Sequence, residues 1–147
     1  MHPRMDISEL IPDIYKAIGV LNTSVKKSGI DPRYLHLAKL RASQINGCAY
    51  CVDLHVKEAT AHGLDSQMLH LIATWPESSF FDDRDRAVLK WTESITLAAQ
   101  TGIPDNDYEA IAAVFSPTEV AQLTVAIAMM NMLNRIGVGS RMQHPIS

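Results

Sequence analysis

The segment from Ser116 to Arg135 constrains the fold more than any other part of the chain. Ser116-Pro117-Thr118-Glu119 is a capping box with proline at the first helical position, so a helix is predicted to begin there. This helix runs to about Arg135 and is apolar on nearly every face. A helix of this kind must be buried all round, either centrally in its own core or partly against another subunit.

Six further helices are predicted from capping residues and from apolar positions at helical spacing. Their predicted starts are Pro12, Asp31-Pro32, Asn46-Gly47, Asp65-Ser66, Asp82 with Asp85, and Pro104-Asp105. Their predicted ends are Lys26-Lys27-Ser28-Gly29, Asn46-Gly47, Gly63, the residue before Pro76, Gly102 and Phe115. No segment shows the two-residue alternation of a strand, so we predict an all-α fold of about seven helices. The 147 residues are expected to form a single domain, residues 1–147.

The chain contains only two cysteines, Cys48 and Cys51, and His55 follows four residues after the second. On a helix these three side chains share an arc about 60° wide, so they can meet at one site. The predicted helix start leaves Cys48 in the first turn, where free backbone N–H groups and the helix dipole favour a thiolate. His55, one turn further on, can accept or return the thiol proton. The pattern therefore indicates a reactive thiol.

Composition and charge argue against several classes of partner. The net charge of −3 and the scattered basic residues give no footprint for nucleic acid or for an anionic membrane. No stretch is long and apolar enough for a signal peptide or a membrane span, so a cytoplasmic location is expected. In that reducing compartment a Cys-x-x-Cys pair is more often catalytic, redox-active or metal-binding than a structural bridge.

The run from Leu40 to His55, LRASQINGCAYCVDLH, closely resembles the core motif of the alkylhydroperoxidase AhpD-like, or carboxymuconolactone decarboxylase, superfamily. The likeness extends less sharply to residues 86–93 and to the helix from Glu119 to Arg135. It thus spans most of the chain.

This resemblance implies a specific activity. Members of the family are all-helical and assemble as homotrimers or homohexamers. They reduce organic hydroperoxides through the two cysteines without a bound cofactor, and a dithiol such as protein-bound lipoamide recycles them. By resemblance, Cys51 is the peroxide-attacking thiolate, Cys48 the resolving thiol and His55 the proton relay.

One position departs from the family pattern. The family relay usually includes a glutamate twelve residues before the first cysteine, and here that residue is His36. An imidazole can shuttle protons near neutral pH, but it cannot supply a fixed negative charge beside His55. Glu58, three residues after His55, is a candidate substitute, although a carboxylate at such a position is more often a solvated surface group.

Other interpretations remain open at this point. The cysteines can be two small buried residues, and His36 can be an ordinary packing histidine. Cys48, Cys51, His55 and His36 also match a Cys2His2 zinc site in count, although one continuous helix rarely supplies three ligands. A lactone-acid decarboxylase of the sister branch and a non-enzymatic thiol sensor are two further alternatives. The favoured hypothesis is a thiol peroxidase with Cys51, Cys48, His55 and His36 as catalytic residues and no metal.

Overall fold

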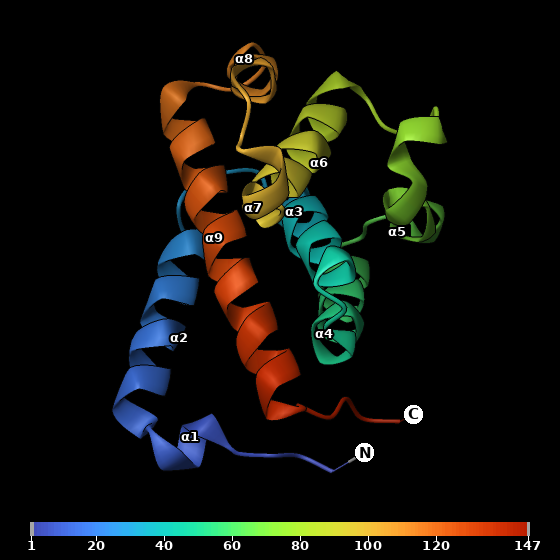
Figure 1. Ribbon diagram of the computed structural model, residues 1–147. Helices are drawn as coiled ribbons and strands as arrows, with labels where there is room; N and C mark the ends of the chain where they lie inside the picture. Colours follow the sequence, from blue (N-terminus) through green and yellow to red (C-terminus); the bar gives the residue numbers. More distant parts are fainter. Residues whose placement is uncertain (1, 147) are drawn as a thin grey trace.

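The computed structural model describes residues 2–146 and confirms the all-α fold (Figure 1). Nine α-helices and one 3₁₀ helix, η1, form this part of the chain, which contains no strand. In chain order they are α1 (Ile7–Leu10), α2 (Pro12–Lys26), α3 (Pro32–Ile45), α4 (Ala49–Ala61), α5 (Ser66–Leu71), η1 (Ile72–Glu77), α6 (Asp83–Thr96), α7 (Ala98–Thr101), α8 (Asp105–Ala112) and α9 (Pro117–Ser140).

Five boundaries differ from the sequence prediction, and one of them is the end of α8, which lies at Ala112 and not at Phe115. A short helix, α1, precedes Pro12, and the 3₁₀ helix η1 continues through Pro76 instead of ending before it. The fifth predicted helix divides at Leu97 into α6 and α7, and Gly102 ends α7 with a left-handed φ of 65°. The last helix extends beyond Arg135 to Ser140. These differences explain why the structure has more helices than the seven expected.

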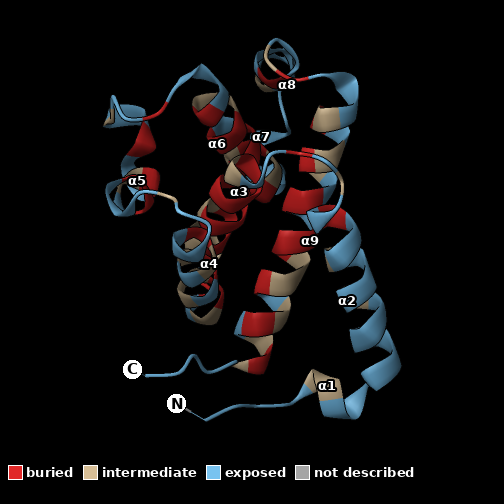
Figure 2. Cartoon of the chain, turned by 180° about the vertical axis from the view of Figure 1, so that it is seen from behind, coloured by how far each residue is buried: buried red, intermediate tan, exposed pale blue. Residues whose placement is uncertain are grey.

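The centre of the fold is formed by α3 and α9, whose buried faces meet (Figure 2). α3 also packs against α6 and α4, and α8 covers α6 and the start of α9. The side chains at the centre are fully buried, among them Leu37, Leu40, Leu89, Leu123 and Ile127. Burial of this apolar surface is the main force that holds the helices together.

α9 is less completely buried than its composition predicts. Most of its residues face α3 and α6, but one stripe along the helix is exposed, formed by Ala121, Val125, Ala128, Arg135 and Val138. Within this stripe, Val125 and Val138 are each about half exposed. Of the two alternatives predicted for this helix, complete burial in the core of its own chain does not hold for this stripe, and burial against another subunit stays a prediction.

Two ion pairs fix α3 against α6. Arg33 donates from Nε and Nη2 to both carboxylate oxygens of the fully buried Asp85, at 2.8 and 2.6 Å. Eight residues along α3, Arg41 reaches Glu93 at 2.7 Å, and Trp75 of η1 donates to the same carboxylate oxygen at 2.8 Å. Because α3 ends beside the cysteine pair, these contacts also fix the position of the site.

α1 and α2 lie along the outside of the bundle, where α2 contacts α9 (Figure 1). Much of the apolar surface of these two helices is exposed, including Leu10, Ile14 and Val20. None of the helices formed by residues 2–146 combines the length and the apolar character that a membrane span requires.

Candidate active site

The cysteine pair lies where the chain turns from α3 into α4. Asn46 caps the end of α3, and Gly47 takes a left-handed φ of 66°, which reverses the chain direction. Cys48 is then the N-cap of α4, with an extended backbone, and its Sγ accepts a hydrogen bond from the N–H of Cys51 at 3.3 Å. The expectation that Cys48 lies inside the first helical turn is therefore wrong by one residue, because the turn at Gly47 leaves Cys48 outside the helix.

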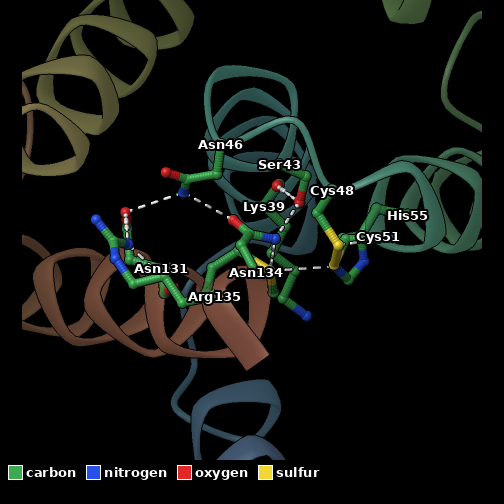
Figure 3. The surroundings of a disulfide bond; sticks show 10 residues. Lys39, Ser43, Asn46, Cys48, Cys51, His55, Asn131, Asn134 and Arg135 are labelled. Carbon is green, nitrogen blue, oxygen red and sulfur yellow. Dashed lines mark hydrogen bonds between the residues drawn. A yellow bond between two sulfur atoms is a disulfide. The ribbon is translucent and has the colours of Figure 1, made fainter. Parts of the chain in front are cut away.

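Cys48 and Cys51 are joined by a disulfide, with their Cα atoms 5.2 Å apart (Figure 3). Both residues are buried, at 2% and 5% exposure. Gly137 of α9 lies directly against them: a Cβ atom there would be 2.9 Å from Cys48 Sγ and 3.4 Å from Cys51 Sγ. The absence of a side chain at residue 137 is what allows α9 to approach the sulfur atoms this closely.

A buried amide network joins the turn before Cys48 to α9 (Figure 3). The Nδ2 of Asn46 donates to the side-chain oxygens of Asn131 and Asn134, both at 3.0 Å. Asn134 in turn donates to Ser43 Oγ at 2.9 Å, and Arg135 donates to Asn131 Oδ1 at 2.8 Å. Sequence reasoning missed these residues, although two asparagines three residues apart in a strongly apolar helix are a signal of such a network.

His55 lies on α4, buried at 6% exposure, between a carboxylate and a thioether. Its Nδ1 is 3.1 Å from Glu58 Oε2, and its Nε2 is 3.2 Å from Met130 Sδ. The hydrogen bond from His55 is the main reason that the pKa of Glu58 falls to about 2, with help from Lys26 at 3.6 Å. Glu58 therefore stays ionised and holds a proton on Nδ1, which leaves Nε2 as the nitrogen able to exchange a proton.

His36 is placed differently from the other predicted site residues. Its Nε2 lies 2.6 Å from Nδ1 of His62, the residue that caps the end of α4. Burial, and secondarily the nearby His62 and Lys39, lower the pKa of His36 to about 4, so the ring is neutral near pH 7. Its Nδ1 is buried and has no hydrogen-bond partner within residues 2–146. The structure thus brings His36 to His62, whereas Glu58 is the residue that contacts His55.

A cavity of about 240 Å³ lies between α2, α4 and α9 and is bordered by Cys51. Its polar side is formed by Cys51, His55, Glu58, Lys39, Lys26 and Asn22. Its other walls are apolar or aromatic and consist of Ile7, Tyr15, Ile18, Gly19, Tyr50, Leu54, Met130, Leu133, Ile136 and Met142. An apolar cavity with a few converging polar groups is the usual form of a small-molecule site.

The two cysteines border different hollows of the molecule. Cys51 borders the cavity, whereas Cys48 borders a shallow, open depression formed by Ser43, Gln44, Gly47, Ala49, Val52, Asp53 and Val56. In the disulfide state both sulfurs are bonded to each other, and in the described part of the chain no group of three or more His, Cys, Asp and Glu side chains is arranged to hold a metal ion. The two cysteines thus form a buried pair, of which Cys51 borders the enclosed cavity and Cys48 the shallow depression.

Comparison with known proteins identifies several relatives of this chain. The model of the carboxymuconolactone decarboxylase family matches residues 12–94. The uncharacterised protein YdfG of Bacillus subtilis is 30% identical over 138 residues, which cover 94% of each chain. A crystal structure from Agrobacterium tumefaciens, of a protein of unknown function suggested to be the antioxidant defence protein AhpD, is 44% identical. It superposes with a TM-score of 0.98 and covers 99% of this chain and 100% of its own.

The same fold occurs in a protein with another reaction. The debrominase Bmp8 is 21% identical and superposes with a TM-score of 0.80, over 90% of this chain and 71% of its own. At this level of identity the likeness concerns the fold alone.

Proposed function

The chain belongs to the carboxymuconolactone decarboxylase family, and from that premise we propose that it is a thiol-dependent reductase of organic hydroperoxides. The observation that carries the proposal is the position of Cys51, whose sulfur borders an apolar cavity that also contains the His55–Glu58 pair. An organic hydroperoxide needs an apolar site, a thiolate to attack it and an acid to protonate the leaving oxygen. The walls of the cavity can supply the apolar site, Cys51 the thiolate once the disulfide is reduced, and His55 the acid.

In the first step the Cys51 thiolate attacks the distal peroxide oxygen. The S–O bond forms, the O–O bond breaks, and Cys51 becomes a sulfenic acid while the alkoxide leaves. His55 supplies the proton that converts the alkoxide to the alcohol, from Nε2, the ring nitrogen that does not face Glu58. Glu58 orients the ring, the role that the family pattern assigns to the position of His36.

In the second step the Cys48 thiol condenses with the sulfenic acid. The S–S bond forms and water leaves, which gives the disulfide seen in the structure. An external dithiol of the lipoamide type then restores both thiols, so that one hydroperoxide and one dithiol yield an alcohol, water and a cyclic disulfide. This cycle requires a reducing compartment such as the cytoplasm.

The reductant and the peroxide can approach from opposite sides. A dithiol that enters the shallow depression meets Cys48 first, and its attack there releases Cys51 as a thiolate towards the cavity. The enzyme therefore returns to the reactive state with the peroxide site unobstructed.

We also propose that the chain self-associates as a homotrimer or homohexamer. Leu10, Ile14 and Val20 expose 68, 58 and 63% of their surface on α1 and α2, and α9 adds its exposed stripe. Exposed apolar surface on this scale is typical of interaction sites. α2 is also a wall of the cavity, so association would hold that wall in place. Light scattering of the purified protein gives the subunit number.

The activity is tested by steady-state consumption of cumene hydroperoxide with dihydrolipoamide as the reductant. We expect many turnovers per subunit, with one disulfide of the reductant formed for each peroxide consumed. A redox sensor would instead oxidise once and stop unless the disulfide is reduced by other means. A decarboxylase would release carbon dioxide from a lactone acid and would not consume the peroxide. Either result would refute the proposal.

A further inference from the structure

Lys39 is a buried cation at the same cavity. Its side chain rises from α3 among the residues that surround the disulfide (Figure 3), and only 3% of the residue is exposed. Within residues 2–146, its ammonium group makes no hydrogen bond and no ion pair. Burial of the side chain lowers the pKa of Lys39, and the nearby carboxylate of Glu58 raises it to a smaller extent.

Glu58, the acidic residue of the cavity, already has two basic partners. Glu58 contacts His55 at 3.1 Å and Lys26 at 3.6 Å, and it remains ionised because of these two partners. Of the charged groups that line the cavity, Lys26 and Lys39 are basic and Glu58 is acidic. The cavity thus has one more positive than negative formal charge. Because Lys26 pairs with Glu58, Lys39 is the basic residue without an ion pair among residues 2–146.

The remaining walls define the rest of the ligand. Side chains such as Ile18, Leu133 and Ile136 surround the cavity opposite the polar side. A ligand that fits these walls has an apolar body and one anionic group. The cavity volume of about 240 Å³ lies just below the range of about 300–1,000 Å³ that is typical of small-molecule sites, so a compact ligand fits best.

We propose that the substrates are compact organic hydroperoxides that carry a carboxylate, and that Lys39 binds this carboxylate while the peroxide group meets Cys51. The inference rests on the proposed peroxidase function and narrows its substrate class. The carboxylate itself takes no part in the reaction. Its binding gives the ammonium group a direct anionic partner, in addition to the more distant carboxylate of Glu58.

The test compares an acid with its uncharged ester. The two substrates are cumene hydroperoxide with a carboxylate at the para position and the methyl ester of the same compound. Wild-type protein should show a kcat/KM at least about tenfold higher for the acid, the worth of one charge-assisted hydrogen bond. Lys39→Met should lose this preference, so that the ratio of kcat/KM for the acid to kcat/KM for the ester falls to about one. Lys39→Arg, which keeps the positive charge, should retain part of the preference for the acid.

A matched control removes the same charge elsewhere. Lys57 is an exposed lysine on α4 that pairs with Asp53 at 2.8 Å, so Lys57→Met should leave the preference for the acid intact. Equal rates for acid and ester in the wild type would overturn the inference. An equal loss of kcat/KM with both substrates in Lys39→Met would also overturn it. That result would mean that Lys39 stabilises the Cys51 thiolate and does not bind the substrate carboxylate, and the peroxidase function would still hold.

A binding measurement decides the question independently of turnover. Calorimetry with the disulfide form and 4-isopropylbenzoate, which has no peroxide group, should show binding that Lys39→Met weakens at least about tenfold. The methyl ester should bind equally weakly to both proteins. If the wild type binds this acid but reduces neither hydroperoxide, the proposed function fails and the carboxylate site stands. If it does not bind the acid, the carboxylate site is refuted.

Discussion

The carboxylate of Glu58 lies 3.1 Å from Nδ1 of His55, one helical turn further along α4. The pair comes from a single helix, so its geometry depends on the local backbone and not on the packing of distant segments. We therefore expect it to remain in place when the cysteines are reduced. This is the part of the site most directly open to a test.

Glu58→Gln should reduce kcat/KM for hydroperoxides by about a hundredfold. The amide keeps the length of the side chain but carries no charge, and its NH2 group can face Nδ1 and favour the wrong tautomer of His55. The measurement is steady-state turnover with saturating dithiol. Glu109→Gln makes the same chemical change at an exposed residue of α8 and should leave the rate unchanged. Normal turnover in Glu58→Gln would remove Glu58 from the relay.

Replacement of each cysteine by serine should give two different outcomes. Cys51→Ser should consume no peroxide, because the attacking thiolate is gone. Cys48→Ser should consume one equivalent per subunit and then accumulate sulfenic and sulfinic acid at Cys51, since no second thiol can resolve it. Mass spectrometry after a single addition of peroxide distinguishes the two. Over-oxidation at Cys48 in the Cys51→Ser variant would reverse the assigned roles.

The features of the fold that the sequence predicted are local ones. Ser116 caps α9 by accepting from the N–H of Glu119 at 3.3 Å, and the Glu119 carboxylate accepts from the N–H of Ser116 at 2.8 Å. Asp82 and Asp85 form the same reciprocal cap on α6. Both signals are complete within four residues, so a sequence contains all the information needed to interpret them.

The site was predictable in part for the same reason. Cys48, Cys51, His55 and Glu58 lie within eleven residues, and helical spacing alone suggested that Glu58 can reach His55. The contact between His36 and His62 joins α3 to the end of α4 across 26 residues, and it depends on how those helices cross. No local pattern contains that information. The role of His36 in catalysis stays a prediction.

The end of α9 also depended on tertiary packing. Gly137 and Gly139 have low intrinsic helix propensity, and the sequence predicted an end near Arg135. The helix continues because its last turns pack beside the disulfide, where Gly137 allows the close approach. A packing requirement of this kind overrides propensity and is invisible before the partner surface is known.

Gly137→Ala should destabilise the oxidised protein by about 1–3 kcal/mol, because the new methyl group would lie 2.9 Å from Cys48 Sγ. Gly139→Ala is the matched control, since a Cβ there meets nothing within 4 Å. That control should be neutral or stabilising by up to about 1 kcal/mol. Chemical denaturation of the oxidised and reduced forms measures both effects. An equal stability change for the two alanines would show that Gly137 does not act through the sulfur atoms.

The free energy of unfolding should fall as the pH decreases from 6.5 to about 4, and His36 is the cause. Its pKa in the folded protein is about 4, below the ordinary value of 6.5, so the unfolded chain binds the proton more tightly across this interval. Stability therefore rises with pH through the interval and is constant above it. One such group gives a slope of at most about 1.4 kcal/mol per pH unit.

His36→Gln should remove most of this slope, whereas His70→Gln, at an exposed histidine of α5, should keep it. Glu58 acts in the same direction but in a lower interval, between its ordinary pKa of 4.5 and about 2. Urea denaturation at half-unit steps from pH 7 to pH 3 separates the two contributions. A slope that is unchanged in His36→Gln would mean that burial of His36 does not keep its ring neutral.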